Sequence, residues 1–130
     1  MNNPPRVLIV DDELQISDLF GRKLTLSGFE VISAMNGQVG YEMAKKEKPD
    51  LILLDLKMPV MDGAEAFAKL KSDPETKDIK VMFLSSYNDR SAMKIDAEFA
   101  KNLGAMDFIP KTDDVDAVVV RVKSALGLNK

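Results

Sequence analysis

Short runs of apolar residues alternate along the chain with longer amphipathic stretches. Three of these runs are apolar at every position, namely Val7–Val10, Leu51–Leu54 and Val81–Leu84. Such runs are typical of strands that are covered on both faces of a parallel sheet. Two weaker strands are expected at Glu30–Ala34 and Met106–Ile109. The pattern therefore predicts five short strands.

The stretches between the strands carry apolar residues at helical spacing and predict amphipathic helices. Their expected buried faces consist of Ile16, Leu19, Phe20 and Leu24, then Ala64, Phe67 and Leu70, then Ala92, Ile95, Phe99 and Leu103, and finally Val115, Val118, Val119, Val122 and Leu126. A weaker helix is expected from about Gln38 to Glu47, and a surface loop over Ser72–Lys80. Gly28, Gly104 and Gly127 follow three of the helices, where glycine supplies the left-handed conformation that ends a helix.

Strict alternation of strand and helix predicts a parallel sheet with right-handed crossovers and helices on both faces. Five such units are too few for an eightfold barrel of about 250 residues. The expected fold class is therefore α/β, a doubly wound five-stranded sheet. We expect a single domain over residues 1–130, with its core at about residues 5–127.

Composition restricts the chemistry that this domain can perform. The 130 residues include no cysteine and no histidine, so disulfides, thiolate or imidazole metal sites and phosphohistidine on this chain are excluded. The net charge of −3 makes direct nucleic-acid binding unexpected. No apolar run reaches the roughly 20 residues of a membrane span, and the N-terminus does not look like a signal peptide. A cytoplasmic protein is expected.

Polar and charged side chains follow the predicted strands at their carboxyl ends, where open α/β sheets bind ligands. They are Asp11, Asp12 and Glu13, then Asp55, then Ser85 and Ser86, and finally Lys111. Each alone is better explained by a turn, a helix cap, a strand end or a solvated surface charge. Together they favour a hard cation such as Mg²⁺ and phosphoryl transfer onto an aspartate, with a hydroxyl and an ammonium group nearby.

Several segments resemble the receiver domains of response regulators in two-component signalling. The resemblance extends over essentially the whole chain and is carried by residues 7–13, 50–63, 84–86 and 104–111. The most specific part is the central block with Asp55, Met58-Pro59 and Met61-Asp62-Gly63. The resemblance implies a flavodoxin-like (βα)5 fold with strand order 2-1-3-4-5.

The resemblance also implies roles for individual residues at the acidic edge. Asp55 would accept the phosphoryl group, and Mg²⁺ would be the cofactor. The metal would be held by Asp11, Asp12, Asp55 and the backbone carbonyl of Lys57.

A second set of implied roles concerns the switch. Lys111 would pair with an acidic-site or phosphoryl oxygen, and Ser85 would be the hydroxyl that moves toward the phosphoryl group. Phe108 would be the aromatic side chain whose rotamer follows that movement. The output surface would comprise the fourth helix, the fifth strand and the fifth helix.

These roles lead to a functional hypothesis and to partners. The chain would be a phosphoryl-accepting signalling switch that assists its own phosphorylation and dephosphorylation and turns over no external substrate. The donor would be a sensor histidine kinase or a phosphotransfer protein, because this chain has no histidine. The output would be a downstream effector protein or a fused effector domain. Neither nucleic acid nor membrane is an expected partner, and a monomer or weak dimer is expected.

Two other functions stay open. Thr112 stands where these receivers usually have proline, and Tyr87–Leu103 is longer than in many of them. These departures motivate a receiver-like interaction module that does not depend on phosphorylation. A phosphohydrolase with an aspartyl intermediate is disfavoured, because Lys57 occupies the position where such enzymes need a second carboxylate.

Overall fold

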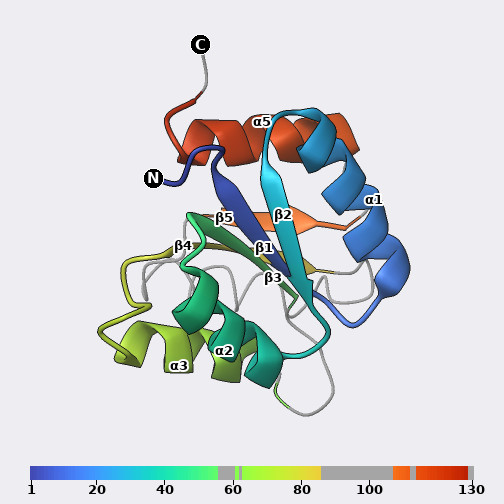
Figure 1. Cartoon of the computed structure of the whole chain (residues 1–130). Coiled ribbons are helices and arrows are strands. Elements are labelled where there is room, and N and C mark those ends of the chain that lie inside the picture. The colour runs from blue at the N-terminus through green and yellow to red at the C-terminus, as the bar shows by residue number, and fades with distance from the viewer. Residues whose placement is uncertain (56–60, 62, 86–106, 112–113, 129–130) are drawn as a thin grey trace.

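The computed structural model describes residues 1–55, 61, 63–85, 107–111 and 114–128, with the backbone alone for residues 85, 107, 108 and 110. Five parallel strands form one sheet in the order β2-β1-β3-β4-β5 (Figure 1). The strands are β1 (Arg6–Val10), β2 (Glu30–Ala34), β3 (Leu51–Asp55), β4 (Lys80–Ser85) and β5 (Asp107–Pro110). The predicted strands and strand order are confirmed, with β5 displaced by one residue from its expected bounds.

Helices cover both faces of this sheet. They are α1 (Leu14–Leu26), α2 (Gly37–Glu47), α3 (Gly63–Ser72) and α5 (Val115–Ala125). In Figure 1, α1 and α5 lie on one face of the sheet and α2 and α3 on the other. The helix predicted around Ala92–Leu103, and Gly104 after it, lie outside the described residues. Among the described helices, none is long and apolar enough to cross a membrane.

Alternation of side chains along each strand divides the core into two layers. Val7 and Ile9 of β1 point toward α1 and α5, where they pack in a cluster with Phe20 and Val122. The intervening Leu8 and Val10 belong to a second cluster under α2 and α3. The strands β1 and β3 are almost fully buried, because helices cover both faces of the sheet. They are therefore apolar on both faces.

The predicted buried faces of two helices need correction. Leu19 is 51% exposed, because the inward stripe of α1 is the narrow row of Ile16, Phe20 and Leu24, spaced four residues apart. In α3, Ala66 is buried and the predicted Ala64 is exposed. The remaining expected residues of α3 and α5 are buried or pack against the core, so those helical faces are confirmed.

The turns around the helices fix where the strands end. Gly28 and Gly127 have φ angles of 100° and 72°, which confirms their predicted left-handed conformation. At the start of α2, the helix backbone lies directly against β1, since a Cβ atom on Gly40 would come within 2.7 Å of Val10 Cγ2. This close approach holds α2 against the end of the strand that precedes Asp11. The loop predicted over Ser72–Lys80 is confirmed with narrower bounds: residues 73–79 join α3 to β4, because Ser72 ends the helix and Lys80 begins the strand.

Candidate functional site

The carboxyl ends of β1, β3 and β5 bring one acidic cluster and one lysine together. Asp11 follows β1, Asp55 is the last residue of β3, and Lys111 follows β5. The strand β4 lies between β3 and β5, so the Lys111 side chain spans its end to reach the carboxylates. The juxtaposition that the sequence predicts for these three residues is therefore present.

Asp11 is held by its backbone and by its side chain. Its backbone N–H donates to the carbonyl of Ala34 over 3.0 Å, which extends the pairing of β1 with β2 by one residue. Its Oδ1 accepts the backbone N–H of Glu13 over 2.8 Å, a turn that aspartate often makes. Only 1% of Asp11 is exposed. From the sequence, Asp11 could be explained either by a turn or by a function. In the structure it makes this turn, and the turn orients the carboxylate in the site.

Three carboxylates converge at this position. Asp55, which is 2% exposed, is held by its place in the sheet opposite Leu84 of β4. Asp12 is partly buried beside it. One carboxylate oxygen from each of Asp11, Asp12 and Asp55 lies within 4.8 Å of the other two. Such a cluster of like charges is unfavourable without a compensating cation.

Lys111 supplies one positive charge to this cluster. Its side chain is only 6% exposed, and its Nζ lies 2.9 Å from Asp11 Oδ2 and 3.3 Å from Asp55 Oδ2. A third and shorter contact, 2.7 Å, joins Nζ to Oε1 of Glu13. The ammonium group therefore shares its protons among three carboxylates. Counted over the part of the chain that the structure describes, and with Asp12 included, four carboxylates stand against this one ammonium group.

Burial and pairing shift the pKa values of these groups. Burial raises the pKa of Asp11 above its usual range, and the hydrogen bond from the Glu13 N–H and the nearby Lys111 offset this only in part. Burial alone would lower the pKa of Lys111, but its hydrogen bonds to Glu13 and Asp11 raise that pKa above the ordinary lysine value. Lys111 is therefore charged at neutral pH.

The donor set fits a hard divalent cation. Its ligands would all be oxygen atoms, and their charge exceeds what Lys111 neutralises. Mg²⁺ prefers such oxygen ligands and usually binds one or two carboxylates while it keeps several waters. The residues present are therefore suited to Mg²⁺, with Asp11, Asp12 and Asp55 as the side chains that would hold it.

The other predicted site residues are described in part or not at all. The backbone of Ser85 lies at the carboxyl end of β4, opposite Pro110, and the backbone of Phe108 lies in β5 opposite Phe83. The side chains of Ser85 and Phe108 lie outside the described residues, as do Lys57 and Thr112. Their switch and ligand roles stay predictions.

The sequence of this chain was compared with the models of known protein families. Residues 7–123 match the family model described as the response regulator receiver domain. The chain belongs to this family. It is thus a receiver domain of two-component signalling, with the acidic phosphorylation site of that family.

Individual relatives agree with this assignment. The receiver domain is 36% identical over 122 residues to the DNA-binding dual master transcriptional regulator RpaA of Synechocystis sp., where the match covers 94% of this chain and 49% of RpaA. It is 34% identical to the polar-differentiation response regulator DivK of Brucella anthropi, with 95% and 98% covered. The chain thus spans about half of RpaA and nearly all of DivK.

Solved structures show the same fold. A CheY-like receiver domain protein from Methanospirillum hungatei superposes with a TM-score of 0.84 at 28% sequence identity. The superposition covers 95% of this chain and 94% of that protein. The likeness extends through the whole α/β arrangement that positions the acidic cluster.

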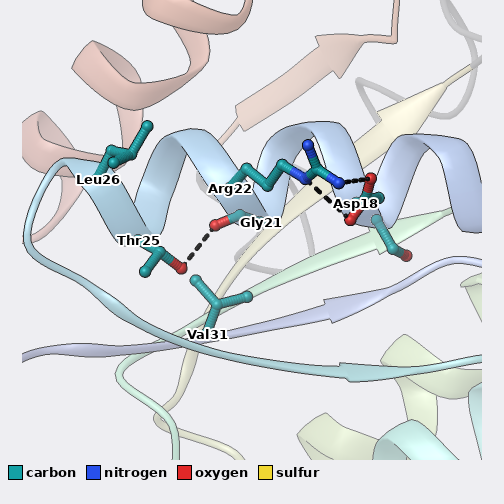
Figure 2. Close-up of a pocket in the computed structure, with 7 residues that line it drawn as sticks. Asp18, Gly21, Arg22, Thr25, Leu26 and Val31 are labelled. Atoms are coloured by element: carbon teal, nitrogen blue, oxygen red, sulfur yellow. Dashed lines mark hydrogen bonds and ion pairs between the residues drawn. The ribbon is translucent and has the colours of Figure 1, made fainter.

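A shallow groove between α1 and β2 lies apart from the acidic cluster. It is lined by Ser17, Asp18, Gly21, Arg22, Thr25, Leu26 and Val31 (Figure 2). Two pairs of its polar groups bond to each other: Arg22 pairs with Asp18 over 3.2 Å, and the Thr25 hydroxyl donates to the Gly21 carbonyl over 2.7 Å. The groove therefore presents no converging reactive groups.

One contact in the receiver site could not be assigned from the sequence. Glu13 was expected at the carboxyl edge, but its spacing gave it no role distinct from that of Asp11 and Asp12. In the structure its carboxylate is turned toward Lys111, and it makes no side-chain bond to the first turn of α1. The available signal was an acidic residue directly after the aspartate pair, at a helix start where glutamate is not a preferred cap.

Proposed function

We propose that this receiver domain is a Mg²⁺-dependent phosphoryl-accepting switch in which Asp55 takes the phosphoryl group from a partner's phosphohistidine. The observation that carries the proposal is the convergence of Asp11, Asp12, Asp55 and Lys111 at one edge of the sheet. Asp55 is the last residue of β3, between the neighbouring strands β1 and β4. Its carboxylate is therefore held in place by the sheet.

The proposed reaction is a displacement at phosphorus. A carboxylate oxygen of Asp55 forms a bond to phosphorus while the bond from phosphorus to the donor imidazole nitrogen breaks, and the imidazole takes up a proton from solvent. Mg²⁺, when bound, neutralises charge on the phosphoryl oxygens. Lys111 already lies 3.3 Å from an Asp55 oxygen, so its ammonium group is placed to pair with a phosphoryl oxygen attached there. Asp11 and Asp12 supply the carboxylates for the cation.

The proposed switch follows from the change in local charge. A phosphoryl group adds about −1.5 to −2 charges and three strong acceptor oxygens at Asp55. Ser85 and Lys111 would be drawn toward these oxygens, and Phe108 would respond by changing its rotamer. The surface formed by the fourth helix, β5 and α5 would then shift between two states whose populations depend on phosphorylation.

The partners follow from the family and from the chemistry. The donor is a sensor histidine kinase or a phosphotransfer protein, since this chain carries no histidine. The receiver acts on itself and turns over no external substrate. Its output goes to an effector, either a separate protein or a domain fused to the receiver; RpaA, of which this chain spans half, is described as a DNA-binding transcriptional regulator.

Phosphorylation is tested with purified protein, Mg²⁺ and acetyl phosphate. Intact-mass measurement is expected to show the addition of one phosphoryl group to wild type and none to Asp55→Asn. Peptide mapping after borohydride reduction locates the modified aspartate. Asp116→Asn is the matched control, because Asp116 is an exposed aspartate on α5 that pairs only with Lys23 among the described residues. This control is expected to be labelled like wild type.

Two results would contradict the proposal. The first is a folded wild type that takes no phosphoryl group from acetyl phosphate or from a phosphorylated histidine partner. The second is labelling that persists in Asp55→Asn. Effector binding that is identical with and without beryllofluoride would instead favour the interaction module that does not depend on phosphorylation.

A further inference from the structure

Lys111 contacts Glu13 in addition to Asp11 and Asp55, and the proposed phosphoryl transfer does not require this third contact. Asp11 and Asp55 belong to the acidic cluster, whereas Glu13 lies at its rim with a side chain that is 55% exposed. The contact between Glu13 Oε1 and Lys111 Nζ is nevertheless the shortest of the three ion pairs, at 2.7 Å compared with 2.9 Å and 3.3 Å. A buried ammonium group is thus shared between the interior of the site and an exposed carboxylate.

The backbone of Glu13 is fixed while its carboxylate can move. Its N–H donates to Asp11 Oδ1, and its carbonyl accepts the N–H groups of Ile16 and Ser17 at the start of α1. The side chain makes no capping bond to the helix. Glu13 can therefore release Lys111 by rotating into solvent, without any change in the turn that orients Asp11.

We propose that Glu13 is a positioning residue that competes with the phosphoryl group for the Lys111 ammonium. This proposal rests on the proposed function and adds a control on it. With the site empty, Glu13 Oε1 holds part of the hydrogen-bonding capacity of Lys111. When a phosphoryl group is attached to Asp55, its more strongly charged oxygens take over that capacity and Glu13 turns to solvent.

The energetic order favours this exchange. An ion pair with a solvent-exposed partner is weak, because water competes for both charges and the side chain loses rotamer freedom. A phosphoryl group carries up to twice the charge of the Glu13 carboxylate and would lie deeper in the site, where screening is smaller. Glu13 is consequently the acceptor that gives way, and its removal strengthens the binding of any phosphoryl-like group that needs Lys111.

The test uses beryllofluoride, which mimics the phosphoryl group on aspartate, and compares wild type with Glu13→Gln and Glu13→Asp. Beryllium is titrated in excess fluoride and saturating Mg²⁺, and binding is followed by amide NMR. Glu13→Gln is expected to tighten the apparent Kd by about two- to fivefold, the factor that an exposed ion pair supports. The NMR signals of the Lys111 Cε and Nζ atoms are expected to change in the free variant, which loss of helix stability alone would not cause.

Glu13→Asp separates the contact from the charge. Its carboxylate keeps the negative charge but is one methylene shorter, and aspartate at a helix start prefers to cap the helix. It should therefore lose the contact to Lys111 and tighten beryllofluoride binding as Glu13→Gln does. Asp18→Asn, which removes an exposed charge from α1 next to Arg22, should leave the Kd unchanged.

The possible outcomes distinguish this proposal from the proposed function. Tighter binding in both Glu13 variants, together with a changed Lys111 signal, supports the competition. An unchanged Kd in both variants overturns it, while phosphorylation of Asp55 stands if acetyl phosphate still labels wild type. Tighter binding in Glu13→Gln but not in Glu13→Asp also overturns it, because bulk charge would then explain the effect. A folded wild type that takes neither beryllofluoride nor phosphate overturns both proposals.

Discussion

Replacement of Asp11 by asparagine is expected to stabilise the metal-free receiver, although Asp11 forms an ion pair. At an effective dielectric constant of about 20, the 2.9 Å contact with Lys111 is worth about 6 kcal/mol of attraction. Repulsion from each of Asp12 and Asp55, whose oxygens lie within 4.8 Å, costs about 3.5 kcal/mol or more. The two repulsions together exceed the attraction by about 1 kcal/mol, and the burial of the charge adds a further cost.

The Asp11→Asn variant keeps the local fold while it removes this charge. Its amide oxygen can still accept the Glu13 N–H, whereas its amide nitrogen takes the place of the Oδ2 atom that paired with Lys111. Lys111 loses this contact and keeps those with Glu13 and Asp55. We expect the free energy of unfolding in EDTA to rise by about 1–3 kcal/mol relative to wild type. Mg²⁺ at 100 times its Kd should stabilise wild type by about 2.7 kcal/mol, and the variant by less, since it lacks one of the three carboxylates that are proposed to hold the ion.

Urea denaturation followed by circular dichroism, in EDTA and in saturating Mg²⁺, measures both effects. Asp18→Asn is the control, because an exposed pair of this kind contributes only about 0–1 kcal/mol and lies away from the cluster. A variant that is less stable than wild type in EDTA would refute the reasoning, since the contact of Asp11 with Lys111 would then outweigh the repulsion. An equal response of wild type and variant to Mg²⁺ would exclude Asp11 as a ligand.

Two further predictions concern stability away from the acidic cluster. Gly40→Ala should lower the free energy of unfolding by about 1–2 kcal/mol, because its Cβ would lie 2.7 Å from Val10 Cγ2. Gly21→Ala should raise the free energy of unfolding by about 0.5–1 kcal/mol, because the nearest atom to its Cβ would be 3.5 Å away. Loss of stability in Gly21→Ala would contradict the packing argument. The pKa of Asp73 is lowered mainly by a hydrogen bond that its carboxylate accepts from the Tyr41 hydroxyl. The stability that Asp73 contributes should therefore be present above pH 3.8 and be lost as the pH falls through its lowered pKa, so the difference between wild type and Asp73→Asn in denaturation midpoint should shrink in acid.

The sequence determines most of the fold because its strongest signals are local. A run such as Leu51–Leu54 is short and apolar at every position, and this is typical of a strand that is covered on both faces. The helical period was less informative about the edges of each buried face. Leu19 is apolar and next to the buried Phe20 in the sequence, but it lies outside the inward stripe of α1. Sequence spacing gives the phase of a helix, whereas its neighbours determine how wide its buried face is.

The candidate site was predictable as a set of residues but not as a set of contacts. Parallel strands end at the same edge, so Asp11, Asp55 and Lys111 could be expected there from topology alone. Which carboxylates Lys111 contacts depends on how far its side chain extends past the end of β4, and spacing along the chain does not contain that distance. The contact of Glu13 with Lys111 could not be predicted for this reason, since the two residues lie 98 positions apart in the sequence.

The excess of carboxylates links the stability of this receiver to its proposed response. A site whose charges balanced would be more stable when empty, but a cation would then relieve little repulsion on binding. Among the described residues, four carboxylates face one ammonium group, so any ligand that adds positive charge or draws Lys111 inward changes the energy of this edge of the sheet. Because Glu13 is the exposed member of this set, it can adjust that response without disturbing the buried residues. A substitution at Glu13 should therefore alter ligand affinity more than folding, whereas a substitution at Asp11 should alter both.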